Sequence, residues 1–222
     1  MTITPELVLK AYAYGVFPMA KSRNDAKVFW VQPKLRGVIP LAQFHVSRSL
    51  RRTLRRGIFR VTVNADFAGV LAGCAESTES RTDTWINGQI TTLFIQLHDA
   101  GLAHSIEVWR DDADGMPELV GGLYGLAMGA AFFGESMFSR ATDASKVALA
   151  HLAAILVKGD FTLLDTQFVS DHLKAFGAIE IPQKEYLAQL SVALARKGEF
   201  RGPVSQPDLE ALLLSQRSTQ RS

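Results

Sequence analysis

Hydrophobic and polar residues follow two different periods along this chain of 222 residues. Segments that alternate at every second position and are rich in β-branched and aromatic residues predict β-strands. Such segments are FRVTV at 59–63, AHSIEVWR at 103–110, ELVGGLYGLAMG at 118–129, AAFFGES at 130–136, FTLLDTQ at 161–167 and AIEIP at 178–182. The acidic turn DDADGMP separates the second from the third, so we expect these two to form a hairpin.

Between these segments, apolar residues recur three or four positions apart, which is typical of helices packed on one face. Thr4 and Asn64 have the side chains of N-caps, Pro5 suits a first helical position, and Gly159 suits a helix end. Helices are therefore expected at 4–15, 64–77, 90–101, 142–159, 171–177 and 183–198.

This order of elements predicts an α/β (α+β) domain at 36–200. It resembles the acetyltransferase (GNAT) fold, a mixed sheet with flanking helices that is splayed near its middle, with the reaction at the splay. Residues 1–35 are expected to form a small N-terminal unit, in which two prolines after the first helix favour a loop or short extended segments. Gly, Pro, Ser, Gln and Arg are frequent from Gly202 onward, so 201–222 are expected to form a loosely held tail.

Composition narrows the class of protein. Hydrophobic residues make up 47% and charged residues 21% of the chain, as in ordinary globular proteins. No window approaches the ~18 apolar residues of a membrane span, and the first ten residues lack the layout of a secretory signal. The single cysteine, Cys74, excludes an internal disulfide framework. We therefore expect a cytoplasmic protein without a membrane partner.

The net charge of +2 does not identify a nucleic-acid binder, but the charge is unevenly distributed. Five arginines occur within RSLRRTLRR at 48–56, and acidic residues gather in the turn at 111–117. A cluster of this kind attracts a polyanion even when the total charge is small. A solvated basic helix face is the alternative interpretation.

The segment FFGESMFSRATDASK at 132–146 has the polar residues of a reactive site, yet it fits neither of two common motifs. A nucleophile elbow needs a second glycine where Phe138 stands. A coenzyme A site would place a glycine-rich loop at this strand-to-helix junction, and MFSRATDASK has no glycine. The five histidines form no H-x-x-x-H pair and no cluster with cysteine, so we expect no metal site.

An ordered set of stretches resembles the leucyl/phenylalanyl-tRNA–protein transferase family. They run from about Ala11 to Tyr186: AYAYGVFPM, RGVIPLAQFHVSRSLRR, FRVTVNADF, DTWI, LHDAGLAHSIEVW, LVGGLYGLAMGAAFFGESMFSRATDASKVAL, LLDTQ, DHLKAFGA and IPQKEY. Each stretch alone is weak, whereas the set in family order is specific.

The resemblance implies an aminoacyltransferase that moves leucine or phenylalanine, and by extension methionine, from aminoacyl-tRNA to proteins with N-terminal Arg or Lys. This addition marks the acceptor protein for degradation under the N-end rule. The family uses no cofactor, and its partners are Leu-tRNA, Phe-tRNA and the acceptor; a monomer is expected. Three alternatives are another aminoacyl-tRNA-dependent transferase, a coenzyme A-dependent N-acetyltransferase on the same fold, and a non-catalytic tRNA-binding module.

The family's catalytic residues correspond to Asp165 and Gln167 at the end of a strand, and to Glu135. Because side chains alternate along a strand, Asp165 and Gln167 are expected on the same side. The carboxylate would orient the attacking amine and collect its proton, directly or through a neighbour, and the amide of Gln167 would hold the amine or relay through hydrogen bonds. The resemblance leaves open which group takes the proton. Asp165 as a cap of the following turn, and Glu135 as a strand-end carboxylate paired with an arginine, remain open interpretations.

The resemblance also implies an apolar pocket for the acyl side chain, in which Met19 stands where the family has a tryptophan. Outside the pocket, Gln183 stands where the family has an arginine, at an RNA or helix-end contact. The matching pocket positions are Tyr12, Met19, Trp85, Phe94, Leu123, Phe132, Gly134, Leu152 and Leu156. Read with the family, the arginine cluster becomes the expected contact for the tRNA acceptor stem. Its members are Arg48, Arg51, Arg52, Arg55 and Arg56.

Overall fold

The computed structural model describes residues 3–77 and 83–219, so residues 1–2 of the expected N-terminal unit and 220–222 of the expected tail lie outside the described chain. The helices are α1 (Pro5–Ala13), η1 (Leu41–Gln43), α2 (Arg48–Arg56), α3 (Phe67–Ala75), α4 (Gly88–Asp99), α5 (Ala144–Lys158), α6 (Asp171–Lys174), α7 (Gln183–Leu194) and α8 (Gln206–Thr219). The strands are β1 (Phe17–Ala20), β2 (Val28–Val31), β3 (Leu35–Ile39), β4 (Arg60–Val63), β5 (Ala103–Asp111), β6 (Pro117–Met128), β7 (Ala131–Ser139), β8 (Leu163–Gln167) and β9 (Ile179–Pro182).

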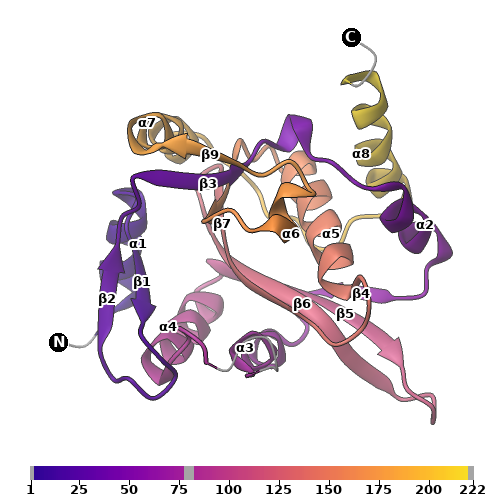
Figure 1. The fold of residues 1–222 in the computed structure, drawn as a ribbon, viewed down its shortest axis with the longest axis horizontal. Helices are drawn as coiled ribbons and strands as arrows, with labels where there is room; N and C mark the ends of the chain where they lie inside the picture. Colours follow the sequence, from indigo (N-terminus) through magenta and orange to yellow (C-terminus); the bar gives the residue numbers. More distant parts are fainter. Residues whose placement is uncertain (1–2, 78–82, 220–222) are drawn as a thin grey trace.

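A seven-stranded mixed sheet forms the centre of the molecule, in the order β4-β5-β6-β7-β8-β3-β9 (Figure 1). β7 and β8 are parallel, and the other neighbouring pairs are antiparallel. β1 and β2 pair separately as an antiparallel hairpin, which corresponds to the short extended segments expected there. The structure therefore confirms the mixed α/β class.

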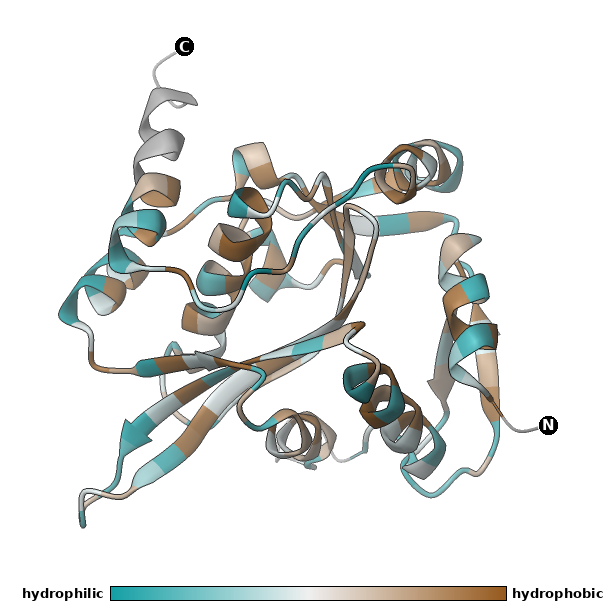
Figure 2. Cartoon of the chain, turned by 180° about the vertical axis from the view of Figure 1, so that it is seen from behind, coloured by the Kyte–Doolittle hydropathy of each residue, from teal (hydrophilic) through white to brown (hydrophobic). Residues whose placement is uncertain are grey.

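Helices cover both faces of the sheet (Figure 1). Leucines and alanines of α5 pack with residues of α2 and α8 in one core cluster. On the other face, α3 and α4 pack in a second cluster, together with residues of α1, β1 and α7. The far end of the β5–β6 hairpin extends from the sheet and is hydrophilic (Figure 2), as the acidic turn predicts. Within the described residues, no helix is both long and apolar enough to span a membrane.

The sheet opens between β7 and β8. Their parallel pairing runs only from Ala131↔Leu163 to Phe133↔Asp165, whereas β7 continues to Ser139. Gly134 is the first residue beyond the pairing, and a Cβ atom there would approach only the carbonyl oxygen of Asp165, at 3.5 Å. The open edge of β7 thus begins beside the end of β8.

Most predicted elements are confirmed, including the caps of the first helix. Thr4 accepts a hydrogen bond from the backbone N–H of Leu7, and Pro5 begins α1. The cap predicted at Asn64 is wrong, because the side chain of Asp66 accepts from Gly69 N–H and begins α3. Asn64 instead has φ +57° and accepts from the N–H of Ser105 on β5.

The elements outside the predicted segments include β3 and α8. β3 lies in a segment assigned to no element, and it inserts between β8 and β9. Residues 206–219, within the expected loose tail, form α8, and its Leu209, Leu212 and Leu213 are buried. These leucines join the core cluster of α5, so the first two turns of α8 pack against the core.

Candidate active site

Asp165, at the end of β8, forms a buried ion pair with Arg36 of β3. The Nη2 and Nε atoms of Arg36 lie 2.6 Å and 2.9 Å from Oδ2 and Oδ1 of Asp165. Both side chains are almost fully inaccessible to solvent, at 1% and 0% exposure. β3 and β8 pair side by side, which places the two groups in contact.

Both oxygens of the Asp165 carboxylate also accept hydrogen bonds from other groups. The hydroxyl of Tyr186, from α7, donates to Oδ2 at 2.7 Å, and the backbone N–H of Gln167 donates to Oδ1 at 2.8 Å. A carboxylate with both oxygens engaged and no exposure is poorly placed to take a proton from a substrate amine. Its contacts are instead those of an anchor for Arg36, Tyr186 and Gln167.

Gln167 ends β8 in a left-handed backbone conformation, with φ +58°. With the amide oriented to suit its neighbours, Nε2 donates to the carbonyl oxygen of Gly134 at 2.8 Å. The side chain therefore crosses the gap where β7 and β8 separate. Strand alternation predicts that the side chains of Asp165 and Gln167 lie on the same side. The contact between the two residues is instead a hydrogen bond from the backbone N–H of Gln167 to the Asp165 carboxylate.

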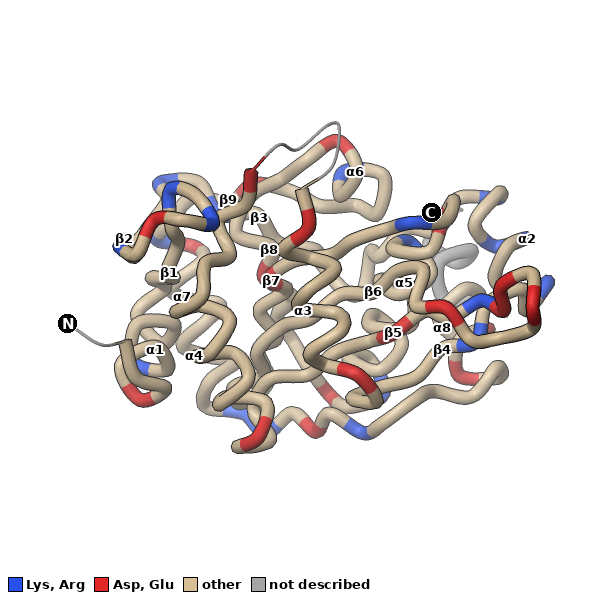
Figure 3. Tube along the Cα trace, turned by 90° about the horizontal axis from the view of Figure 1, so that it is seen from below, with Lys and Arg blue, Asp and Glu red and all other residues tan. Residues whose placement is uncertain are grey.

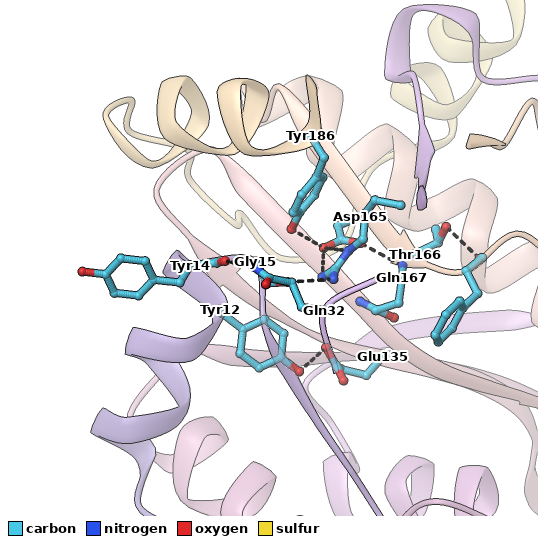
Figure 4. Close-up of polar contacts among 11 residues, drawn as sticks. Tyr12, Tyr14, Gly15, Gln32, Glu135, Asp165, Thr166, Gln167 and Tyr186 are labelled. Atoms are coloured by element: carbon cyan, nitrogen blue, oxygen red, sulfur yellow. Dashed lines mark hydrogen bonds and ion pairs between the residues drawn. The ribbon is translucent and has the colours of Figure 1, made fainter. Parts of the chain in front are cut away.

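Glu135 is the next residue of β7, and it is only partly buried. Its Oε1 accepts a hydrogen bond of 2.7 Å from the hydroxyl of Tyr12 in α1 (Figure 4). Burial raises the pKa of Glu135 to about 8; the Tyr12 hydrogen bond opposes this shift, and the charge of Asp165 adds to it. A carboxyl group with a pKa in this range can exchange protons near neutral pH.

A cavity of about 380 Å³ adjoins these residues. Six consecutive residues of β7, from Gly134 to Ser139, form one wall, and α5 forms another. Leu149 and Leu152 supply apolar surface from α5, and Thr166, which precedes Gln167 in β8, also lines the cavity. The cavity thus runs along the open edge of β7.

The nine positions expected in an acyl pocket separate in the structure. Leu123, Gly134 and Leu152 line the cavity. Phe132 and Leu156 are buried in the core cluster of α5, whereas Phe94 is buried in the opposite cluster. The other three positions lie near the N-terminal hairpin: Tyr12 bonds Glu135, and Met19 and Trp85 are partly buried against the second cluster.

The arginines of α2 lie at the end of the molecule opposite the β1–β2 hairpin (Figure 3). Four of them are exposed: Arg48, Arg52, Arg55 and Arg56. Arg51 differs, because it is half-buried and donates to the backbone carbonyls of Val46 and Leu213. The buried Leu50 and Leu54 attach the helix to the core.

The sequence interpretation missed Arg36 and Tyr186. Arg36 occurs in the family-like stretch RGVIP at 36–40. The β-branched residues Val38 and Ile39 of this stretch are a local sign of the strand β3. The partnership of Arg36 with Asp165, 129 residues later in the chain, depends on long-range pairing that no local pattern reveals. Among the described residues, no group of three His, Cys, Asp or Glu side chains could hold a metal ion.

Comparison with known proteins finds similarity along nearly the whole chain. The sequence profile described as leucyl/phenylalanyl-tRNA protein transferase matches residues 38–191, and the profile of the N-terminal domain of that transferase matches residues 1–34. A solved structure of L-PGS from Bacillus licheniformis aligns at 10% identity over 98% of this chain and 71% of that chain, with a TM-score of 0.39, which is too weak to assign the fold.

Curated relatives named leucyl/phenylalanyl-tRNA–protein transferase are much more similar. The relative from Rhodopseudomonas palustris strain HaA2 is 56% identical over 206 residues, which are 92% of this chain and 90% of the relative. Those from Paramagnetospirillum magneticum and Ruegeria sp. strain TM1040 are 57% and 52% identical over 89% and 100% of this chain, and over 92% and 100% of their own lengths. The chain therefore belongs to the leucyl/phenylalanyl-tRNA–protein transferase family.

Proposed function

We propose that this protein transfers leucine or phenylalanine from aminoacyl-tRNA to the α-amino group of proteins that begin with Arg or Lys. The observation that carries the proposal is the hydrogen bond from Gln167 to the carbonyl of Gly134, which places Gln167 next to Glu135 and the largely apolar cavity, in a chain of this family. Attachment of the new residue would mark the acceptor for degradation by the N-end rule.

The reaction is aminolysis of an ester. The neutral α-amine attacks the acyl carbonyl, a C–N bond forms, and the C–O bond to the ribose breaks. The amine loses a proton in total, and the ribose oxygen gains one. In the proposal the ionised form of Glu135 receives the amine's proton, because Glu135 lines the cavity and burial raises the pKa of its carboxyl to about 8. Gln167 orients the amine, and Asp165 holds Gln167 in place.

The cavity along β7 is proposed to hold the acyl side chain. Leu123, Leu149 and Leu152 supply apolar contacts there, and Gly134 leaves space on the strand. An apolar site discriminates by volume and shape, and one methylene changes binding by only ~1–3 kcal/mol. Leucine, phenylalanine and methionine can therefore share the site, whereas alanine would leave much of it unfilled.

The exposed arginines of α2 are proposed to bind the acceptor stem of the tRNA. Thr53 of α2 donates a hydrogen bond to Asp143, the residue that precedes α5. Ser145, in the first turn of α5, lines the cavity. A stem bound on α2 would therefore lie beside the cavity end that Ser145 forms, and its single-stranded 3′ end would follow the open edge of β7.

Three finer features complete the proposal. The sheet that opens between β7 and β8, with a helix following β7, supports an acetyltransferase-like fold that works without coenzyme A. The single cysteine, which is buried, suits action in the cytoplasm, where aminoacyl-tRNA is made. A monomer supplies every residue assigned to the reaction.

Incubation with labelled Leu-tRNA and short peptides tests the function. A peptide that begins with Arg should gain one leucine, and a peptide identical except for an initial Ala should gain little. Equal labelling of both peptides would contradict the acceptor specificity. Labelling of neither, with tRNA bound, would contradict the transferase activity.

A further inference from the structure

Arg36 joins two parts of the molecule that are distant in sequence. On one side, its guanidinium binds Asp165 of β8 through Nε and Nη2. On the other side, Nη1 donates to the backbone carbonyl of Gly15 at 3.0 Å. Gly15 follows α1 and has φ +75°, where a Cβ would come within 2.8 Å of Leu187. One side chain thus connects the N-terminal segment to the end of β8.

The guanidinium is also enclosed by aromatic rings. Its carbon lies 4.6 Å from the centroid of the Phe17 ring in β1 and 4.6 Å from that of Tyr186 in α7. Cation–π contacts of this kind strengthen when the cation is removed from water. Burial alone would lower the pKa of Arg36, but the hydrogen bonds and charge of Asp165 outweigh it and raise that pKa. The side chain is therefore a fixed cation.

Stability alone does not account for such an arrangement, because well-packed apolar residues often replace a buried ion pair without loss. The contacts lead instead to the reacting groups. Arg36 fixes the Asp165 carboxylate, and Asp165 Oδ1 accepts the N–H of Gln167, whose backbone is left-handed. Gln167 then reaches Gly134 across the open sheet.

We propose that Arg36 is a positioning residue, which aligns the Gln167 amide for transfer by holding Asp165 against the N-terminal segment. This inference rests on the proposed transferase function. The same segment also supplies Tyr12, which binds Glu135. The segment from α1 to β1 therefore forms part of the active site, since it holds both groups assigned to the chemistry.

The variant Arg36→Lys is the direct test. Lysine keeps the charge but has one ammonium group in place of a planar fork, so it cannot reproduce the paired contact with Asp165 and the bond to Gly15 together. Misplacement by ~1 Å can slow an enzyme by about 10²-fold. We expect single-turnover transfer from Leu-tRNA to slow by about that factor, with the half-saturating peptide concentration and the tRNA Kd unchanged.

A double-mutant cycle with Gln167→Ala distinguishes positioning from general support of the fold. If Arg36 acts through Gln167, Arg36→Lys should slow the Gln167→Ala enzyme by less than about twofold, because groups that act as a unit are not additive. A full loss of about 10²-fold in that background would overturn the proposal. So would a wild-type rate for folded Arg36→Lys.

Two further variants keep the test decisive. Tyr186→Phe removes one donor to Asp165 while leaving the ring over Arg36, so it serves if Arg36→Lys does not fold. It should slow transfer several-fold, and again only when Gln167 is present; additive loss would count against the proposal. Val108→Ala, a buried core change on β5, controls for lost stability and should leave the rate per folded enzyme unchanged. Failure of the wild type to transfer at all would instead refute the proposed function.

Discussion

Replacing both members of the Arg36–Asp165 pair should cost little more stability than replacing either one. Each single variant, Arg36→Met or Asp165→Leu, leaves one charge buried without its partner. Removing one member of a buried pair costs about 3–5 kcal/mol. For a chain of this size, 1 kcal/mol shifts Tm by roughly 2–4 °C, so each single variant should melt roughly 6–20 °C lower.

The double variant removes both charges, so its cost comes from the groups that lose a partner. These are the Gln167 N–H, the Tyr186 hydroxyl and the Gly15 carbonyl. A buried polar group without a partner costs about 1–3 kcal/mol, and methionine and leucine recover part of this by packing. The double variant should therefore be destabilised by about 3–5 kcal/mol, whereas additivity of the singles predicts about 6–10 kcal/mol.

Urea denaturation followed by circular dichroism provides the measurement, with equal m-values as the check that all four proteins unfold between comparable states. A coupling energy of at least ~2 kcal/mol supports the ion pair as one energetic unit. Additive losses would refute this reasoning, because they would mean that each side chain is stabilised by separate contacts.

Three further predictions concern the other parts of the site. Burial raises the pKa of Glu135 from 4.5 to about 8, so between these pH values the folded protein holds a proton that the unfolded protein has lost. The stability of wild type relative to Glu135→Gln should therefore be greatest below pH 4.5 and fall as pH rises through about 8, as measured by urea unfolding from about pH 5 to 9. Leu152→Phe should reduce the single-turnover rate of Phe transfer more than that of Leu transfer, whereas Leu156→Met, in the core, should leave the ratio of the two rates unchanged. An equal loss of rate for both substrates in Leu152→Phe would exclude Leu152 from the acyl site. Arg52→Ala should weaken tRNA binding and reduce the slope of log binding constant against log salt concentration by ~0.9 or less, and an unchanged slope would favour a solvated helix face. Arg51→Ala should chiefly lower Tm, because Arg51 donates a hydrogen bond to the carbonyl of Leu213.

The sequence predicted the elements that have strong local signals. The helix of α5 and the strands β5 to β8 were recognisable from apolar periodicity, and the pattern at Thr4 and Pro5 indicated a helix start. The cap at α3 shows the limit of such reasoning. Asn64 and Asp66 both have capping side chains, and only the hydrogen bonding of Asn64 to β5 leaves Asp66 as the cap.

The candidate site was only partly predictable for a related reason. Asp165, Gln167 and Glu135 were identified by resemblance to a family, and the structure places them around the opening of the sheet. Arg36 was missed because β3 is short and its neighbours in the sheet come from the other end of the chain.

Whether a position expected in the acyl pocket lines the cavity depends on the face of the sheet or helix that its side chain occupies. Phe132 faces the α5 core, and Phe133 faces the opposite cluster, as alternation requires. Local periodicity shows that such residues are buried, but it does not show whether they line a cavity. Leu152 and Leu156 share one helix, yet only the first lies on the cavity wall described above.

The most direct test of the proposed transfer is to determine which atom of the acceptor peptide carries leucine after one turnover. Wild-type enzyme, Leu-tRNA and a peptide beginning with Arg should be quenched early, and the product analysed by fragmentation mass spectrometry. We expect one leucine residue in amide linkage to the α-nitrogen of that arginine, and no product from the same peptide acetylated at its N-terminus. Leucine attached to a side chain, or transferred equally to the acetylated peptide, would contradict transfer to the α-amino group.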